Sequence, residues 1–480
     1  MTDVGRHPKI KLYTMTEVVD VQGYVGNFKV KLLKKARYVT ENDCTSCGEC
    51  SKVCPVVRPD EFNQGLSSRR AIYSPFPQAV PSAYVININE CLGHDLSVCA
   101  KCIEVCEKKC INFHMSDEEI TEEVGSIIVA TGCSPYDPRE MDEYGYTRFE
   151  NVLTSLELER MVNAGGPTKG ELIRPTDKKL PKSIGFIQCV GSRSASKGGE
   201  YCSNVCCMNT IKSTLVIKEH NPEVEVKVFY IDIRAFGKGF EELYRRSRRL
   251  GVQYIRGLPG TVEELGNKNL KIAVENTVTG KVDFHELEML VLAIGMRPNK
   301  ANRKIQEILG LQLTPDGFFL EAHPKLMPVD AATRGIFFAG CAEGPKDIKE
   351  SVTQGSAAAA RAIRLMHDGE ITTEPITSEI IVEKCTSCGK CQEVCPYNAI
   401  SVDKKKKTPA IVNSAACAGC GTCAAECPFD AIIMNHFTDN QITVQINAML
   451  EEKPQSKILC FACNWCSYAG ADYAGVSRVQ

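Results

Sequence analysis

The chain has 480 residues, of which 43% are hydrophobic and 24% charged, a composition typical of globular rather than disordered proteins. Its formal net charge of −2 argues against broad affinity for nucleic acid or anionic membranes. It contains no apolar run near the ~20 residues that span a bilayer, and its start lacks the apolar core of a secretory signal. We therefore expect a cytoplasmic protein with no membrane span and several domains.

Cysteine is the outlier of the composition, with 26 residues. In a long chain without an export signal, so many cysteines favour metal ligation over disulfides.

The first predicted element is a hairpin over Met15–Lys35, with Gly23 and Gly26 near its turn. A cysteine-rich block follows, which contains a proline-rich connection over Ser74–Tyr84.

Two cysteine runs repeat each other almost residue for residue. They are CTSCGECSKVCP, from Cys44 to Pro55, and CTSCGKCQEVCP, from Cys385 to Pro396. The spacing is typical of bacterial ferredoxins, in which three cysteines of one run and the fourth of another hold each [4Fe–4S] cluster. A pair of zinc ribbons is the alternative, but zinc sites use two CxxC pairs. Each run therefore predicts a two-cluster ferredoxin domain.

Four sets of cluster ligands follow from this pattern. They are Cys385, Cys388, Cys391 and Cys427; Cys417, Cys420, Cys423 and Cys395; Cys44, Cys47, Cys50 and Cys106; and Cys54 with Cys91, Cys99 and Cys102. Cys110 lies where ferredoxins place a small core residue, so we interpret it as a buried free thiol. His94 is interpreted as a surface histidine or one beside a ligand.

The region between the two blocks reads as an α/β domain. Its apolar, β-branched runs predict buried parallel strands over Ser126–Gly132, Ser183–Gly191, Val224–Arg234, Met289–Gly295 and Gly335–Gly340. Amphipathic helices are expected over Lys238–Gly251 and Glu350–Gly369, the second ending at a glycine.

Three turns of this region resemble those of pyridine-nucleotide-disulfide-type flavoproteins. ATG contains Thr131 and Gly132, AIGMRPN contains Gly295, and GIFFAGCAEGPK contains Gly340, Cys341 and Lys346. The last opens a small-residue helix whose N-terminus would face the flavin pyrophosphate, with Cys341 replacing the usual Asp. These residues are candidate flavin contacts. The alternative is any doubly wound fold with a small-residue helix.

The strand SIGFI leads into a loop of thiols where a nucleotide-binding turn would carry glycines. The chain contains no G-x-G-x-x-G followed by an acidic residue, and Cys189, Cys202, Cys206 and Cys207 occupy the loop. Thiols do not permit the close approach to pyrophosphate that glycines allow, but they could hold a cluster at the helix N-terminus. The alternatives are four buried or reactive thiols, or a redox-active thiol at Cys206 or Cys207.

The C-terminal stretch holds Cys460 and a CxxC pair, Cys463 and Cys466, around the single Trp465. It ends without a second pair. A zinc knuckle or free thiols are the alternatives to a cluster.

Taken together, these residues resemble the A subunit of heterodisulfide reductase, a flavin and iron–sulfur protein. The likeness covers residues 1–440 and includes IYSPFPQAVP, QCVGSR, YCSNVCC and AHPKLMPVD. It implies a fifth [4Fe–4S] cluster on Cys189, Cys202, Cys206 and Cys207, and places Lys325 near the flavin N5. The tail is similar to the start of the [2Fe–2S] delta subunit of a hydrogenase.

The resemblance also implies a function. The chain would pass electrons from a two-electron donor to the heterodisulfide of coenzymes M and B and to ferredoxin, by flavin-based bifurcation. Its expected partners are the B and C subunits, a hydrogenase or formate dehydrogenase, and ferredoxin. FAD would be shared with an adenine-binding half that the chain lacks, as expected of a fragment, a split-gene product or an incomplete gene model. The alternatives are a flavin-free electron wire and an NAD(P)H-dependent disulfide reductase.

The expected fold is a partial α/β thioredoxin-reductase-like flavoprotein fold with two bacterial-type 2[4Fe–4S] ferredoxin domains of the α+β class. The predicted segments are 1–34, a partial FAD-domain hairpin; 35–114, an inserted ferredoxin domain; 115–180, the FAD-domain continuation; 181–318, an NAD-domain-like subdomain with the cysteine loop; 319–375, a C-terminal FAD-binding segment; 376–440, the second ferredoxin domain; and 455–480, a truncated hydrogenase delta-like segment.

Overall fold

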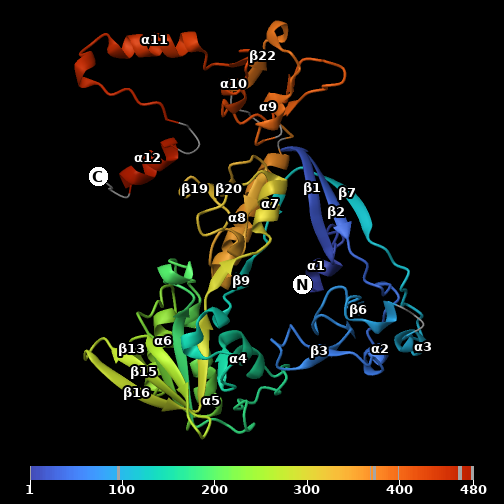
Figure 1. Cartoon of the computed structure of the whole chain (residues 1–480), viewed down its shortest axis with the longest axis vertical. Helices are drawn as coiled ribbons and strands as arrows, with labels where there is room; N and C mark the ends of the chain where they lie inside the picture. Colours follow the sequence, from blue (N-terminus) through green and yellow to red (C-terminus); the bar gives the residue numbers. More distant parts are fainter. Residues whose placement is uncertain are drawn as a thin grey trace. The chain divides into compact units, whose positions relative to one another are not determined.

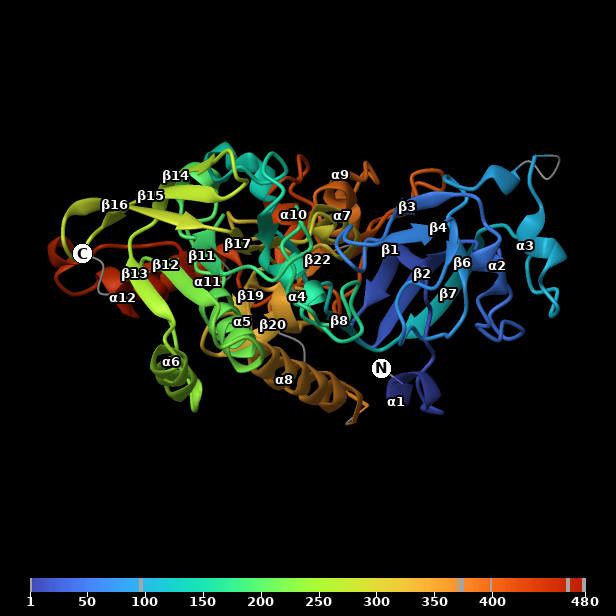
Figure 2. The same ribbon diagram turned by 90° about the horizontal axis from the view of Figure 1, so that it is seen from below.

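The computed structural model describes residues 2–94, 98–367, 369–370, 375–397, 399–462 and 467–476 (Figures 1 and 2). Contacts divide the chain into two units. The first comprises Met1–Glu17, Leu33–Ile120 and Ser134–Arg297, and the second Val18–Leu32, Thr121–Cys133 and Pro298–Gln480.

A parallel sheet is the centre of the first unit. Its strands run in the order β10 (Val152–Thr154), β17 (Met289–Ile294), β11 (Ser183–Val190), β12 (Glu225–Tyr230) and β13 (Gln253–Arg256), with every neighbouring pair parallel. β17 is buried along almost its whole length, as its continuous apolar run predicts. The strands predicted over Ser183–Gly191, Val224–Arg234 and Met289–Gly295 are confirmed.

Helices and a second sheet cover this parallel sheet. α5 (Cys206–His220) packs on β11 and β17 and against α6 (Phe240–Arg249), as Figures 1 and 2 show. The antiparallel strands β14 (Pro259–Glu264), β15 (Leu270–Asn276) and β16 (Lys281–Leu287) contribute to the same core as Ile187 and Phe229. α4 (Ser155–Met161) begins with a capping box between Thr154 and Glu157.

The first cysteine block belongs to the first unit and is mostly loop. Its short elements are α2 (Glu49–Lys52), β3 (Val57–Pro59), β4 (Ser68–Arg70), β5 (Ile72–Tyr73), β6 (Val85–Ile86) and α3 (Lys101–Glu104). Cysteines and a few aliphatic side chains, among them Val39, Ile72 and Ile86, form its core.

The second unit contains two small sheets and a long helix. The predicted hairpin is confirmed as β1 (Thr16–Tyr24) and β2 (Asn27–Lys34), beside β7 (Glu118–Val124). A second sheet has the order β19 (Glu321–His323), β20 (Met327–Ala331), β21 (Ile336–Phe338) and β8 (Ile127–Val129), in which β21 and β8 are parallel. α7 (Asn302–Leu309) and the short turn η5 (Gly340–Ala342) belong to the same unit, and α8 (Ile348–His367) packs on β20, β21 and β8.

The second cysteine block repeats one local structure. α9 (Lys390–Glu393) and α10 (Thr422–Ala425) each follow a glycine with positive φ, Gly389 at 81° and Gly421 at 77°. Glycine is needed there because other residues rarely adopt left-handed backbone. The strands are β22 (Ser378–Ile380), β23 (Ile400–Ser401), β24 (Ile411–Val412) and β25 (Ile432–Met434).

Two helices follow, α11 (Asp439–Leu450) and α12 (Ser467–Val476). Across the residues that the structure describes, no helix is both long and apolar enough to cross a bilayer.

Candidate metal centres and flavin-type turns

Four pockets of the structure are each lined by four cysteines. The cysteine sets are Cys385, Cys388, Cys391 and Cys427; Cys395, Cys417, Cys420 and Cys423; Cys54, Cys91, Cys99 and Cys102; and Cys189, Cys202, Cys206 and Cys207. The folded chain thus brings together thiols that are as many as 48 positions apart, and each group is one of the sets expected from the spacing.

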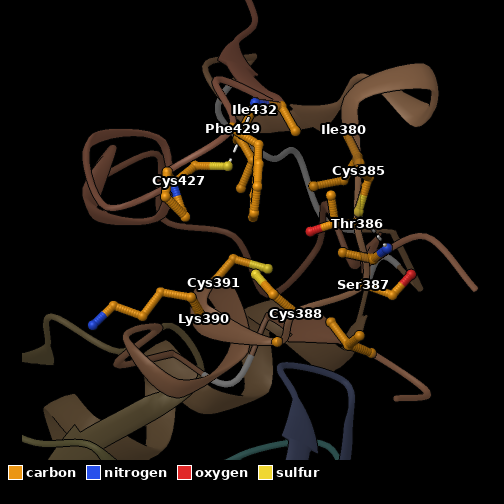
Figure 3. A pocket seen from close by; sticks show the side chains of 15 residues that line it. Ile380, Cys385, Thr386, Ser387, Cys388, Lys390, Cys391, Cys427, Phe429 and Ile432 are labelled. Carbon is orange, nitrogen blue, oxygen red and sulfur yellow. Dashed lines mark hydrogen bonds between the residues drawn. The ribbon is translucent and has the colours of Figure 1, made fainter. Parts of the chain in front are cut away.

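The first of these pockets shows how the local fold gathers its thiols. Cys385, Cys388 and Cys391 come from the loop before α9 and from its first turn, while Cys427 follows α10 (Figure 3). Ile380 and Ile432 close the pocket with apolar contacts (Figure 3). Shielding from water of this kind is one factor that sets the reduction potential of an iron–sulfur cluster.

Main-chain amides point at several of these sulfurs. Ala431 N donates to Cys427 Sγ at 3.4 Å, and Ala399 N donates to Cys395 Sγ at 3.3 Å, four residues after the cysteine in each case. Ala410 N lies 3.5 Å from Cys385 Sγ. Such amides stabilise a thiolate and tune the clusters that thiolates bind.

The remaining set, Cys44, Cys47, Cys50 and Cys106, lies around the core of the first block. Burial, followed by the neighbouring Cys44, raises the pKa of Cys50 to about 12. Cys110 is buried, and its Sγ lies 3.4 Å from that of Cys106. It stands four residues after Cys106, the position that Ala399 and Ala431 have in the second block.

The thiol loop after β11 has an unusual backbone. Cys189 has a φ of 60°, and the pairing of β11 with β17 shifts register between Ile187 and Val190. A bulge of this kind redirects a side chain out of the regular alternation of a strand. Cys202 lies in the loop, and Cys206 and Cys207 begin α5, so the thiols meet at the carboxyl end of a central strand.

These thiols resist ionisation in the absence of metal. Burial, followed by the neighbouring Cys207, raises the pKa of Cys189 to about 11, and burial likewise raises the pKa values of Cys206 and Cys207. Metal binding displaces the protons of thiol ligands, so its free energy is the natural compensation for gathering them.

Charged residues around the thiol loop were given no role by the sequence. Arg193, Asp232 and Arg234 line the pocket, and Arg193 Nη1 lies 2.7 Å from Asp232 Oδ1. Arg193 also donates toward Cys189 and lowers its pKa against the effect of burial. The motif QCVGSR contained this arginine, but the approach of Asp232 and Arg234 depends on β12 lying next to β11.

The flavin-type turns lie at the carboxyl ends of β8 and β21. Thr131 and Gly132 follow β8, and Gly340 and Cys341 follow β21. Thr131 Oγ1 and Gln354 Oε1 of α8 are buried without a hydrogen-bond partner. Gly132 and Gly340 have φ values of 71° and 67°, and an added Cβ would meet nothing within 3.4 Å.

The other candidate flavin contacts lie apart from these turns along the chain. Lys346 forms an ion pair with Glu343. Lys325 is exposed between β19 and β20, where its backbone N–H donates to His323 Nδ1 at 3.2 Å. Gly295 belongs to the first unit, where a Cβ would lie 2.1 Å from Ser192 Oγ and 2.8 Å from Ser203 Oγ. Gly295 therefore permits the close packing of β17 against the thiol loop.

Among the described residues, no three His, Cys, Asp or Glu side chains converge as the ligands of one metal ion would. Cys463 and Cys466 lie outside the described residues. The exposed Cys460 precedes them.

Comparison with known proteins gives one family model, described as a 4Fe-4S dicluster domain, which matches residues 384–431. The predicted α/β class and the C-terminal dicluster ferredoxin domain are confirmed, by the parallel sheet with its helices and by this match. The ferredoxin domain predicted over 35–114 stays a prediction.

Several curated relatives match most of the chain. All three described here are A subunits of CoB–CoM heterodisulfide reductases. An iron–sulfur A subunit of Methanopyrus kandleri, the second of two in that organism, is 51% identical over 84% of this chain and 61% of its own length. That of the H2:CoB–CoM heterodisulfide,ferredoxin reductase of Methanothermobacter thermautotrophicus is 49% identical over 94% and 68%. That of the ferredoxin/F420H2-dependent reductase of Methanosarcina acetivorans is 42% identical over 100% and 60%. The chain thus spans about two thirds of the length of these relatives.

Solved thioredoxin reductases are more distant. That of T. acidophilum has a TM-score of 0.32 and 11% identity over 53% of this chain and 70% of its own. That of Lactococcus lactis has a TM-score of 0.33 and 16% identity over 62% and 86%.

Proposed function

Because the chain belongs to the family of heterodisulfide reductase A subunits, we propose that it is an electron-transfer component of such a complex. Clusters bound by its cysteine sets relay electrons between a two-electron donor and two acceptors, the CoM–CoB heterodisulfide and ferredoxin. The observation that carries this proposal is the presence of four pockets, each lined by a complete four-cysteine set.

In this proposal the chain binds about five [4Fe–4S] clusters, each held by four cysteine thiolates. Four occupy the pockets, and the fifth is held by Cys44, Cys47, Cys50 and Cys106. The amides that face Cys385, Cys395 and Cys427 support such clusters, since hydrogen bonds to sulfur stabilise their negative charge.

We further propose that FAD binds at the turns after β8 and β21. The buried and unpartnered oxygens of Thr131 and Gln354 fit a polar ligand, and the glycines beside them leave room for one. The N-terminus of α8 suits an anionic pyrophosphate. Gly340, Cys341 and Lys346 would contact the ligand from the same side, and Lys325 and Gly295 are further candidates. FAD would supply the exchange between two-electron and one-electron transfer.

The partners in this proposal are the B and C subunits of the reductase, a hydrogenase or formate dehydrogenase, and ferredoxin. Relatives are named as H2-dependent or H2/formate-dependent reductases and as ferredoxin-dependent ones. The heterodisulfide would be cleaved on one of these partners. A place in the cytoplasm suits a chain with so many free thiols, which a reducing compartment protects.

The competing proposal is a flavin-free wire of clusters alone. Anaerobic reconstitution followed by gel filtration separates the two, because both predict about 20 iron atoms per chain but only the first predicts retained flavin. The matched sample is the chain mixed with the N-terminal part of a relative, since the flavin site is proposed to be shared. Flavin absent from both samples would leave the wire.

Bifurcation is tested in the complete complex. Oxidation of the two-electron donor is expected to reduce heterodisulfide and ferredoxin together in a fixed ratio. Full heterodisulfide reduction without ferredoxin present would indicate simple transfer instead.

A further inference from the structure

Two cysteines outside the predicted cluster sets meet at one edge of the β19–β20–β21–β8 sheet. β8 and β21 are parallel, Val129 is paired with Phe338, and Ala339 N donates to Val129 O at 3.0 Å. Cys133 lies four residues after Val129, and Cys341 lies three residues after Phe338. Since the carboxyl ends of parallel strands share an edge, the two side chains converge there.

The two thiols are in direct contact. They form a side-chain hydrogen bond with each other, and both residues are free and only partly buried. Sulfurs in contact can be joined by a disulfide with little movement of the backbone. Partial exposure also leaves them open to small reagents.

The surroundings make the two thiols unequal. Cys341 Sγ lies 3.5 Å from the main-chain oxygen of Lys346, close to the first turn of α8, where Ser351 also bonds it. The hydrogen bond from Cys133, together with the Lys346 main chain, Ser351 and the Lys346 ammonium, lowers the pKa of Cys341 to about 6. The same hydrogen bond, assisted by burial, raises the pKa of Cys133.

The other charges near this pair are largely neutralised. Glu343 is bound by Lys346 and accepts a hydrogen bond from Gln354 Nε2 at 2.8 Å. Asp347 and Glu350 cap the start of α8 through each other's backbone N–H groups. The helix N-terminus adds a favourable field for a thiolate.

We infer that Cys133 and Cys341 form a redox-active dithiol, which low-molecular-weight organic disulfides oxidise reversibly to an intramolecular disulfide. Cys341 is the attacking thiolate and Cys133 the resolving thiol. The pair is a site of two-electron chemistry separate from the cluster ligands.

The reaction balances as two exchanges. The Cys341 thiolate attacks one sulfur of the organic disulfide, forming a mixed disulfide and releasing one organic thiolate. Cys133 then attacks Cys341 Sγ, forming the Cys133–Cys341 bond and releasing the second thiolate, while the Cys133 proton passes to a released thiolate. One disulfide bond is broken and one is formed, so two protein thiols are oxidised and the organic disulfide is reduced.

The test uses the full chain after anaerobic reconstitution of its clusters. It is treated with bis(2-hydroxyethyl) disulfide, quenched in acid, alkylated, and cut with a glutamyl endopeptidase, which separates Cys110 from Cys133. Mass spectrometry is expected to find a Cys133–Cys341 cross-linked peptide that disappears after reduction with dithiothreitol. The exposed Cys460 reports that the reagent was active. No cross-link under conditions that modify Cys460 would overturn the inference.

Single variants distinguish the two roles. Cys133→Ser is expected to trap the mixed disulfide on Cys341, at about ten times the yield found on Cys133 in Cys341→Ser. Cys460→Ser is the control and should leave the cross-link unchanged. Unchanged iron content shows that the variants have folded. Equal yields on the two cysteines would overturn the assigned order of attack.

Discussion

At the scale of single residues, the chemistry depends on which thiols share a site. Cys110 and Cys206 are both buried, yet Cys206 lies in a pocket with three other cysteines, while Cys110 replaces an alanine of the repeated block. The same side chain is therefore assigned a ligand role in one place and a packing role in the other.

This difference gives a matched pair of variants. Cys206→Ala is expected to lower the iron content by about four atoms per chain, because a [4Fe–4S] cluster normally needs all four thiolates. Cys110→Ala should leave the iron content unchanged. Iron analysis after anaerobic reconstitution measures both. Unchanged iron in Cys206→Ala would remove the thiol-loop cluster, and a loss in Cys110→Ala would make Cys110 a ligand.

The acidity of Cys341 gives a pH prediction. Its pKa is lowered to about 6, so it is protonated below that pH and is largely thiolate at pH 7. Its rate of alkylation by iodoacetamide should rise through pH 6 and level off above about pH 7. An ordinary thiol, with a pKa near 8.5, should keep gaining about tenfold per pH unit over that range. Peptide mass spectrometry over a pH series measures this, with Cys460 as the comparison.

Lys346→Met tests the cause of that acidity. Loss of the ammonium should shift the profile of Cys341 to higher pH and leave that of Cys460 unchanged. A profile for Cys341 that follows Cys460 in the unaltered chain would contradict the assigned thiolate.

At the scale of elements, the turn after β11 is shaped by close packing. Gly191 has a φ of 77°, and an added Cβ would lie 2.2 Å from the ring of Tyr136. Gly198, in the same loop, has a φ of 65° but open space around it. Both need left-handed backbone, but only Gly191 also needs the absence of a side chain.

Gly191→Ala and Gly198→Ala therefore separate two costs. The left-handed backbone should cost about 1–2 kcal/mol in both variants. The clash with Tyr136 should add about 1–3 kcal/mol in Gly191→Ala alone. Thermal unfolding followed by circular dichroism compares the two. Equal losses would mean that Tyr136 moves aside freely.

At the scale of the whole molecule, the stability of the parts has different origins. The α/β part has a core of large aliphatic and aromatic side chains, including Phe186, Phe229 and Ile211. The two cysteine blocks have cores made largely of cysteines with a few small aliphatics. Small cores of this kind depend on bound metal for their stability.

Removal of iron should therefore act locally. After treatment with a chelator under reducing conditions, limited proteolysis is expected to cleave first within 44–110 and 385–427, while fragments with the parallel sheet persist. Mass spectrometry of the fragments locates the cuts. Cleavage spread evenly over the chain would contradict a local role for the metal.

The sequence alone determined the strand and helix positions and the grouping of the cysteines, because apolar runs and ferredoxin spacing are local patterns. It could not show the left-handed Cys189 or the bulge beside it, since both depend on how β11 pairs with β17. Nor could it reveal Arg193, Asp232 and Arg234 around one pocket, or the contact between Cys133 and Cys341. Those residues come together only when parallel strands distant in the chain end at the same sheet edge, a decision made by tertiary packing.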